Sequence, residues 1–509
     1  MKTIKILAVS VFLALGSNVF AGGLLTNTNQ NIAFNRMFAR VGTIGIDGVY
    51  SNPAGVAFLS NGLHLSFNFQ NVYQTRTIKS GLTVPSLQGT PFYQPFSLFE
   101  GDQNGIKEFK GEAAVPILPS FQAAMNYDKW GFQLGFGIMG GGGKATFNDG
   151  LASFERTVAM IPALLASQGL TSATPGYSVN SYLSGRQYIY GLQLGSTYKI
   201  NDKVAVYGGL RFNYISNRYE GSITGITANI DGKNENLYDF FGSKAEALNQ
   251  LVLLYTTKAD NAANDVERGK LLGEAEKYKA MAKGMQTTRQ QFADRHLDCT
   301  QSGWGITPII GVDVKLNRLN IGARYEFTTR LNIENKTKHD DTGLFKNGVN
   351  TPNDLPGILA VGAQYEVLPQ FRVSAAYHYY FDKSARMDKD KQKLLKSNTQ
   401  EMLLGAEYDI TKAVQVSAGV QRTKYGLGNG EFLSDLSFVT SSYSVGFGAG
   451  IRLKENMKLN VAYFWTNYET FDKAYDMTVT TPSGSLPVKA TDSFTRTNKV
   501  LGVGLDIDF

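Results

Sequence analysis

The sequence predicts an all-β protein: a 14-stranded antiparallel transmembrane β-barrel with an N-terminal plug and a helical extracellular loop insertion. Segments of about ten residues alternate between apolar and polar or glycine positions, which is the pattern of strands between lipid and a lumen. Beyond the N-terminus, no stretch approaches the roughly 20 apolar residues that a spanning helix needs. Charged residues make up only 18% of the 509 residues, below the about 25% typical of soluble domains.

The same composition excludes several functional classes. The formal charge is +7, but the basic residues do not cluster, so nucleic-acid binding is not expected. A single cysteine excludes a disulfide framework and a cysteine-based metal cluster. The four histidines lack ligand spacing and no serine motif accompanies them, so we expect no metal, no cofactor and no enzymatic activity.

The N-terminus has the features of an export signal. Lys2 and Lys5 precede an apolar run over residues 6–15, and Val19-Phe20-Ala21 is a suitable cleavage site. Residues 1–21 are therefore predicted to be a signal peptide, and the mature protein is predicted to leave the cytoplasm.

The last strand shows the alternation most clearly. Gly and Asp occupy its even positions, whereas its odd positions are apolar: Leu501, Val503, Leu505, Ile507 and Phe509. Taken alone, this segment also fits an amphipathic edge strand of a soluble sheet. The pattern recurs, however, in the segments that start at Leu359, Val414, Tyr443 and Leu459. This recurrence favours a membrane barrel, and the terminal Phe509 resembles the signal read by the barrel-assembly machinery.

Short polar turns give the strand count. Six of them join adjacent alternating segments: Asp128-Lys129, Asn201-Asp202, Asn317-Arg318, Leu368-Pro369, Ile410-Thr411 and Glu455-Asn456. Six hairpins supply twelve strands, and further strands near 62–78 and 490–509 complete fourteen. Such a barrel, over residues 61–509, has a lumen too wide for its own side chains to fill, so it needs a plug or is an open pore.

Three segments lie outside the strand pattern. Residues 22–60 lack alternation and precede the first strand, so they are the predicted plug. Residues 146–183 carry an apolar patch whose expected role is ligand binding: Met160, Ile161 and Leu164, with neighbours. Residues 221–299 are predicted to be a helical outer loop with two apolar stripes. Leu251 and Tyr255 of the first stripe either line a ligand groove or pack within a helical hairpin.

Several motifs resemble the FadL-type family of outer-membrane transporters for long-chain fatty acids and other hydrocarbons, which includes TodX-like importers. Ser51-Asn52-Pro53-Ala54-Gly55 is similar to the family's plug motif, here Asn52, Pro53 and Ala54. Residues 198–203 with Gly208-Gly209-Leu210, and Gly303-Trp304-Gly305, agree as well. The resemblance implies a monomer in the Gram-negative outer membrane, in contact with lipid and lipopolysaccharide.

The resemblance also implies a route for the substrate. A hydrophobic molecule avoids water by capture among outer loops, transfer to an internal pocket and lateral exit through a kinked third strand. The candidate for this kink is a run of glycines, because glycine weakens strand pairing: Gly137, Gly140, Gly141, Gly142 and Gly143. The alternative is that this run is the flexible end of an outer loop.

A carboxylate on the substrate would require an anchoring cation. Arg218 is the candidate, since it lies near the position of a basic ligand residue in the family. A neutral hydrocarbon needs no such residue. The sequence thus predicts an importer of hydrophobic small molecules, and the alternative is a porin-like or surface-adhesive barrel.

Overall fold

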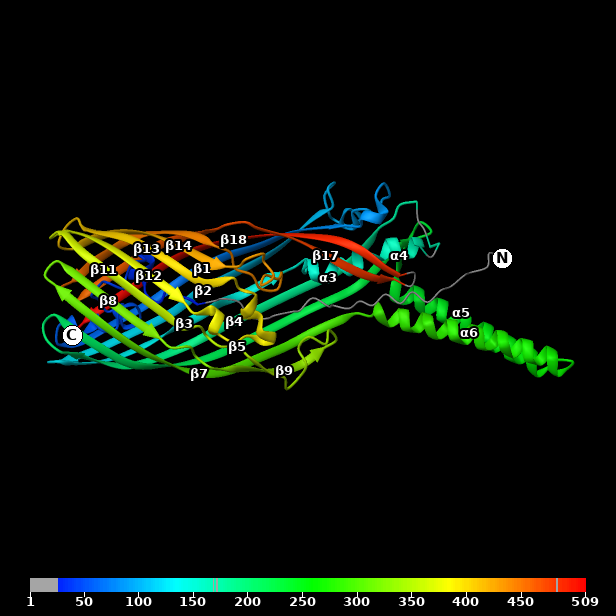
Figure 1. Cartoon of the computed structure of the whole chain (residues 1–509), viewed down its shortest axis with the longest axis horizontal. Helices are drawn as coiled ribbons and strands as arrows, with labels where there is room; N and C mark the ends of the chain where they lie inside the picture. Colours follow the sequence, from blue (N-terminus) through cyan, green and yellow to red (C-terminus); the bar gives the residue numbers. More distant parts are fainter. Residues whose placement is uncertain (1–25, 168, 171–172, 482–483) are drawn as a thin grey trace.

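The computed structural model describes residues 26–167, 169–170, 173–481 and 484–509 (Figure 1). The expected signal peptide, residues 1–21, lies outside the described residues.

The strands form one closed antiparallel barrel with 14 wall positions, as predicted. The barrel closes between β1 and β18, which pair continuously from His64 opposite Asp508 to Thr83 opposite Lys489. Strands β1 (Gly62–Thr83) and β18 (Gly484–Asp508) each fill one wall position. Nine further positions are also single strands: β2 (Ile106–Tyr127), β3 (Trp130–Phe147), β4 (Tyr177–Lys199), β5 (Val204–Ile230), β7 (Arg295–Leu316), β12 (Phe371–Tyr380), β13 (Ser397–Asp409), β14 (Val414–Gly426) and β15 (Ser442–Lys454).

Three wall positions are each built from two consecutive pieces. These are β8 (Leu319–Glu326) with β9 (Asn332–Asp340), β10 (Asn350–Pro352) with β11 (Ile358–Leu368), and β16 (Met457–Tyr468) with β17 (Phe471–Thr481). All six predicted turns join the expected strands. They lie at the end of the barrel that holds the C-terminus, opposite the end with the long loops, here called the mouth (Figure 1).

The outer wall carries the predicted apolar face. Leu501 and Val503 are exposed, whereas Gly502 and Gly504, which alternate with them, face inward against the N-terminal segment. Phe67, Trp130 and Phe447 are likewise exposed on other strands. A band of exposed apolar and aromatic side chains on a closed barrel is the surface of a protein that spans a bilayer with strands.

The segment before β1 folds inside the barrel. It contains α1 (Ile32–Arg36), α2 (Gly48–Ser51) and the short 3-10 helix η1 (Gly55–Phe58), and nearly every residue from 30 to 57 is buried. Asn31 caps α1 by accepting a hydrogen bond from the Ala33 amide. Because this segment is enclosed by strands, it occupies the lumen that the wall alone leaves empty.

The mouth is covered by loops with their own apolar core. The loops of the mouth contain two short α-helices, α3 (Ala152–Ala159) and α4 (Ile161–Ser167), and four 3-10 helices: η2 (Pro85–Leu87), η3 (Pro95–Leu98), η4 (Asp382–Ser384) and η5 (Asp388–Leu394). Lys107 of β2 forms an ion pair of 2.8 Å with Glu155 of α3, and Arg156 forms another with Asp492 of β18. These pairs hold α3 against the wall.

Helices α5 (Leu237–Asp260) and α6 (Asp265–Gln291) form a hairpin that projects from the mouth (Figure 1). The expected helical loop, residues 221–299, is too long. β5 continues to Ile230 and pairs with the short strand β6 (Lys233–Asn236), and β7 already begins at Arg295. The reason is that buried Ile226, Ala228 and Ile230 alternate as a strand does beyond the membrane.

Within the part of the chain that the structure describes, no helix is long and apolar enough to cross a membrane.

Candidate functional site

The Asn52-Pro53-Ala54 motif fastens the plug to the wall. The Asn52 amide donates to the Asp313 carboxylate of β7 at 2.6 Å and to the Thr43 carbonyl at 3.0 Å. Gln133 of β3 donates to the Pro53 carbonyl at 2.7 Å. Ala54 is fully buried against Tyr207 and Ile309. A compact turn thus contacts three wall strands at once.

Replacing Asn52 with Ala is expected to lower the free energy of unfolding by about 1.5–3 kcal/mol, because a hydrogen bond to a buried carboxylate is lost. Urea titration of the protein in lipid vesicles measures this. Asn456→Ala removes a turn contact of similar length to the Asp508 carbonyl, 3.0 Å, at an exposed site. If both variants lose the same stability, the Asn52 contact has no special role.

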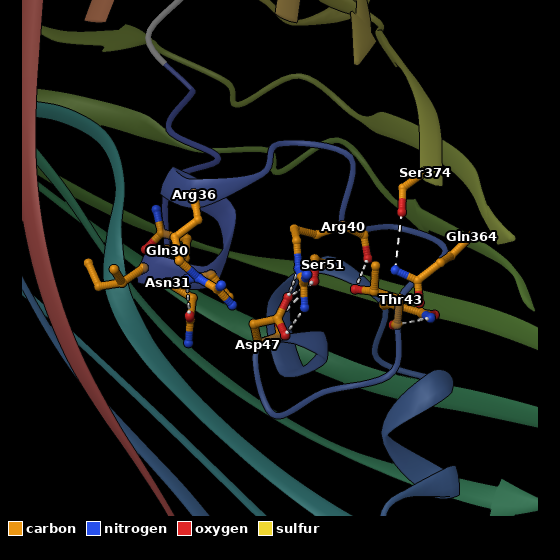
Figure 2. A network of polar contacts seen from close by, with 12 residues as sticks. Gln30, Asn31, Arg36, Arg40, Thr43, Asp47, Ser51, Gln364 and Ser374 are labelled. Atoms are coloured by element: carbon orange, nitrogen blue, oxygen red, sulfur yellow. Dashed lines mark hydrogen bonds and ion pairs between the residues drawn. The ribbon is translucent and has the colours of Figure 1, made fainter. Parts of the chain in front are cut away.

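A buried ionic network joins the plug to the opposite wall (Figure 2). Arg40 binds Asp47 through two hydrogen bonds of 2.7 and 2.8 Å and reaches Glu407 of β13 at 3.2 Å. Arg36 lies 3.8 Å from the same Glu407 carboxylate. Burial alone would raise the pKa of Asp47, but the Arg40 guanidinium outweighs it and holds that pKa below its usual value. The plug is therefore held to the wall by buried charged groups, each of which compensates the charge of its neighbours.

The wall is interrupted between β2 and β3. These strands pair up to Phe121 opposite Phe136 and again from Ala113 opposite Ala145, but residues 114–120 and 137–144 have no partners across this seam. We call this interruption the wall gap. Pro116 and Pro119 lie within it on β2, and proline cannot donate a hydrogen bond to a neighbouring strand. The unpaired stretch of β2 is thus built into its sequence.

On the β3 side, the predicted glycine run forms the other edge of the wall gap. Gly141, Gly142 and Gly143 have φ values of 72°, 120° and 138°, a region that side chains other than glycine rarely adopt. Relative to β4, Met139 and Gly142 are each an extra residue that bulges out of the ladder. These bulges turn β3 away from β2.

The start of the plug lies against this bulge. The Asn27 amide nitrogen donates to the Met139 carbonyl at 2.8 Å, and its side chain donates to the Gly141 carbonyl at 2.8 Å. Gln30 donates to the Ile138 carbonyl at 2.8 Å. Three carbonyls of this unpaired stretch of β3 are therefore bound by the plug.

The wall gap lies at the level of the apolar band. In the register of β1 and β2, Phe69 stands opposite Pro119 and Val72 opposite Val115. Phe69 and Ile117 point outward with exposed fractions of 53% and 67%. A passage through the gap would open among lipid-facing side chains.

Inside the mouth lies an apolar cavity, here called the mouth pocket. Of the described residues that line the mouth pocket, only Arg295 is charged, and most of the others are apolar: Phe154, Leu183, Tyr219, Leu297, Phe345 and Leu436.

A second cavity, here called the inner chamber, adjoins the mouth pocket and reaches the wall gap. The two share Leu183, Tyr219 and Leu436 as lining residues. The inner chamber also touches the glycines of the gap and several polar side chains: Asn27, Gln74, Arg76, Gly141, Gly142, Gly143, Gln187 and Arg496.

The predicted ligand residues lie in two different parts of the outer loops, the mouth and the helical hairpin. Met160, Ile161 and Leu164 are buried in the mouth, and Phe154 of the same segment lines the mouth pocket. In the hairpin, the Tyr255 ring stacks on Tyr278 at 5.3 Å, with Leu251 partly buried nearby. This arrangement corresponds to the alternative in which the helices bury their own stripe.

Arg218 already has two carboxylate partners, Glu220 at 2.7 Å and Asp298 at 3.4 Å, and its side chain is 42% exposed. The sequence reasoning missed Pro116, Pro119, Arg76 and Arg496. The two prolines carry a signal that the sequence offers directly, since two prolines within one strand mark an unpaired edge. The two arginines carry none, because only strand register brings them together.

Comparisons of the whole fold give consistent neighbours. The chain superposes on a Pseudomonas aeruginosa FadL homologue with a TM-score of 0.57 at 13% identity, covering 96% of this chain and 100% of that one. The Ralstonia pickettii toluene transporter TbuX gives 0.50 at 12% identity, covering 96% and 99%. No family model and no curated protein sequence matches the chain. The resemblance indicated by the sequence motifs is confirmed at the level of the fold.

Proposed function

We propose that this protein imports hydrophobic small molecules, long-chain fatty acids or related hydrocarbons, across the outer membrane of a Gram-negative cell. The observation that carries the proposal is the wall gap, because a barrel that only conducts polar solutes along its axis has no use for an opening at lipid level. The fold shared with a FadL homologue and a toluene transporter supports the same class of substrate.

The route begins in the mouth pocket, whose apolar lining takes a hydrophobic molecule out of water at a gain of about 25 cal/mol per Å² of buried surface. The substrate then passes Leu183, Tyr219 and Leu436 into the inner chamber. It leaves sideways between β2 and β3 into the bilayer. The plug closes the axial route, so the hydrophobic molecule never crosses the water-filled end of the barrel.

The final step requires the plug start to move. Asn27 and Gln30 hold the β3 carbonyls at the gap, and Asn27 also lines the inner chamber. Their contacts are ordinary hydrogen bonds of about 0.5–1.5 kcal/mol each, so a bound substrate can displace them. The ionic network around Arg40 lies deeper in the plug and stays in place during this motion.

Uptake by whole cells tests the proposal. Cells that make the protein are expected to take up radiolabelled hexadecanoate or toluene at least about tenfold faster than cells without it, while uptake of a small sugar stays the same. Uptake of the sugar distinguishes an importer of hydrophobic molecules from a porin-like barrel. Faster sugar entry with no effect on either hydrophobic probe would identify a porin-like barrel and contradict the import function.

A further inference from the structure

A row of basic side chains crosses five neighbouring strands of the wall. Lys144 of β3 stands opposite Arg186 of β4, and Arg186 stands opposite Arg218 of β5. The same line continues through Thr300 of β7 to Lys336 of β9. We call its four cations the basic row. Because neighbouring strands lie about 4.8 Å apart, the row extends over about 19 Å of the wall.

The basic row lies on the outside of the barrel. Ala145, Gln187 and Tyr219 each follow a member of the row directly in sequence, and all three line the inner chamber. Side chains alternate between the two faces of a strand, so the members of the row point outward. The side chain of Arg218 is 42% exposed, and the other three residues are exposed as well.

The protein itself compensates only part of this charge. Like charges directly opposite each other on one face of a sheet are destabilising. Arg218 forms ion pairs with Glu220 at 2.7 Å and Asp298 at 3.4 Å. Among the described residues, the other three members of the row have no acidic side chain within 4.0 Å, although Glu334 faces the same way as Lys336. Three cations therefore remain available to an external anion.

A row of aromatic side chains runs parallel to the basic row, on the side away from the mouth. Tyr190, Tyr214 and Trp304 are direct partners on β4, β5 and β7. Tyr and Trp on the outside of a barrel mark the interface between membrane and water. Arg186 bends back toward this interface and lies over the Tyr188 ring at 5.8 Å. The basic row is thus placed at the head-group level of the outer leaflet.

The lipid of that leaflet has the complementary charge. In a Gram-negative outer membrane it is largely lipopolysaccharide, whose lipid anchor carries phosphates at both ends of its sugar backbone and acyl chains beneath them. A guanidinium pairs with phosphate through a planar fork of donors, and an ammonium group binds it as a point charge. A row of about 19 Å is longer than the single phosphate of an ordinary phospholipid can contact.

We propose that the basic row binds the phosphates of one lipopolysaccharide molecule, whose acyl chains lie against the aromatic row. Lys144 ends the unpaired stretch of β3, so the bound lipid lies at the outer edge of the wall gap. This inference goes beyond hydrophobic import and needs only the location in the outer membrane. Either function can therefore fail in experiment without the other.

Matched lipids test the anion. Native mass spectrometry of the full-length protein in a non-ionic detergent measures its affinity for phosphorylated lipid A and for the same lipid A after its phosphates have been removed. The parent is expected to bind the phosphorylated lipid at least about tenfold more tightly, because each cation near an anionic lipid surface adds to binding. Equal affinities of the parent for the two lipids would overturn the proposal.

A triple variant locates the site: Lys144→Gln, Arg186→Gln and Lys336→Gln. It is expected to lower the affinity for phosphorylated lipid A at least about tenfold and to change that for the dephosphorylated lipid less than about twofold. The control removes three exposed lysines elsewhere on the wall: Lys79→Gln, Lys424→Gln and Lys499→Gln. It is expected to bind like the parent. Equal losses in the two triple variants would show attraction by net charge alone and contradict a site.

Two further probes distinguish lipopolysaccharide from other sources of phosphate. Phosphatidylglycerol is expected to bind the parent at least about tenfold more weakly than lipid A, because one phosphate meets fewer cations of the row. Inorganic phosphate at equal concentration is expected not to displace lipid A. Equal binding of phosphatidylglycerol, or displacement by phosphate, would contradict a lipopolysaccharide site. Each variant must keep the parent's heat-modifiable mobility on a gel, which reports an intact barrel.

Discussion

Deleting Met139 and Gly142 together is expected to reduce hydrophobic uptake at least about tenfold while the barrel still assembles. These are the two residues of β3 that have no counterpart on β4. Their removal makes the β3–β4 register continuous and, because two residues are lost, keeps the same side chains facing inward. Without the two bulges β3 no longer bends at this point, so the wall gap is expected to narrow, although Pro116 and Pro119 still keep part of β2 unpaired.

Uptake of radiolabelled hexadecanoate and toluene by cells with matched outer-membrane levels measures this effect. An equal deletion at the tip of the helical hairpin, Ala262 and Ala263, is the control, since the tip is far from the wall (Figure 1). Parent-like uptake by a barrel that lacks both bulges would show that the substrate leaves by another route.

Replacing Glu407 with Gln is expected to release the plug and open the barrel to ions. Glu407 is 6% exposed and is the wall carboxylate shared by Arg36 and Arg40. Removing one partner of a buried charge network costs about 3–5 kcal/mol, because the remaining charges stay desolvated without compensation.

Single-channel recordings in planar bilayers measure the outcome: the parent is expected to stay closed and the variant to show steps of a wide pore. Glu469→Gln is the control, because its 2.7 Å pair with Arg422 is partly exposed and is worth about 0–1 kcal/mol. Closed recordings from both variants would show that the plug does not depend on this carboxylate.

The sequence alone determined the wall. Alternation with a period of two is a local property, and each of the six short turns is marked by the residues at the turn itself, so strand number and order followed without a structure. The glycine run of β3 could be found in the same way, because a positive φ restricts the residue at that position and no other.

The outer loop was predicted less accurately for a local reason as well. Ile226, Ala228 and Ile230 keep the alternation of a strand, but this stretch follows an irregular step at Gly225, which has a φ of 61°. A single irregular residue breaks the period and hides the continuation of β5. The helices that follow were recognised because their stripes are long and regular.

Only the tertiary structure decided which charges are paired. Arg218 and Arg496 are both arginines on alternating strands, and each has an acidic residue nearby in the sequence, Glu220 and Asp492 respectively. Arg218 meets Glu220 and Asp298, whereas Arg496 meets Arg76 from a strand more than four hundred residues away. The sequence specifies which face of a strand a side chain occupies. Which residue that side chain meets across the lumen or the closing seam depends on strand register and barrel closure, which are properties of the whole barrel.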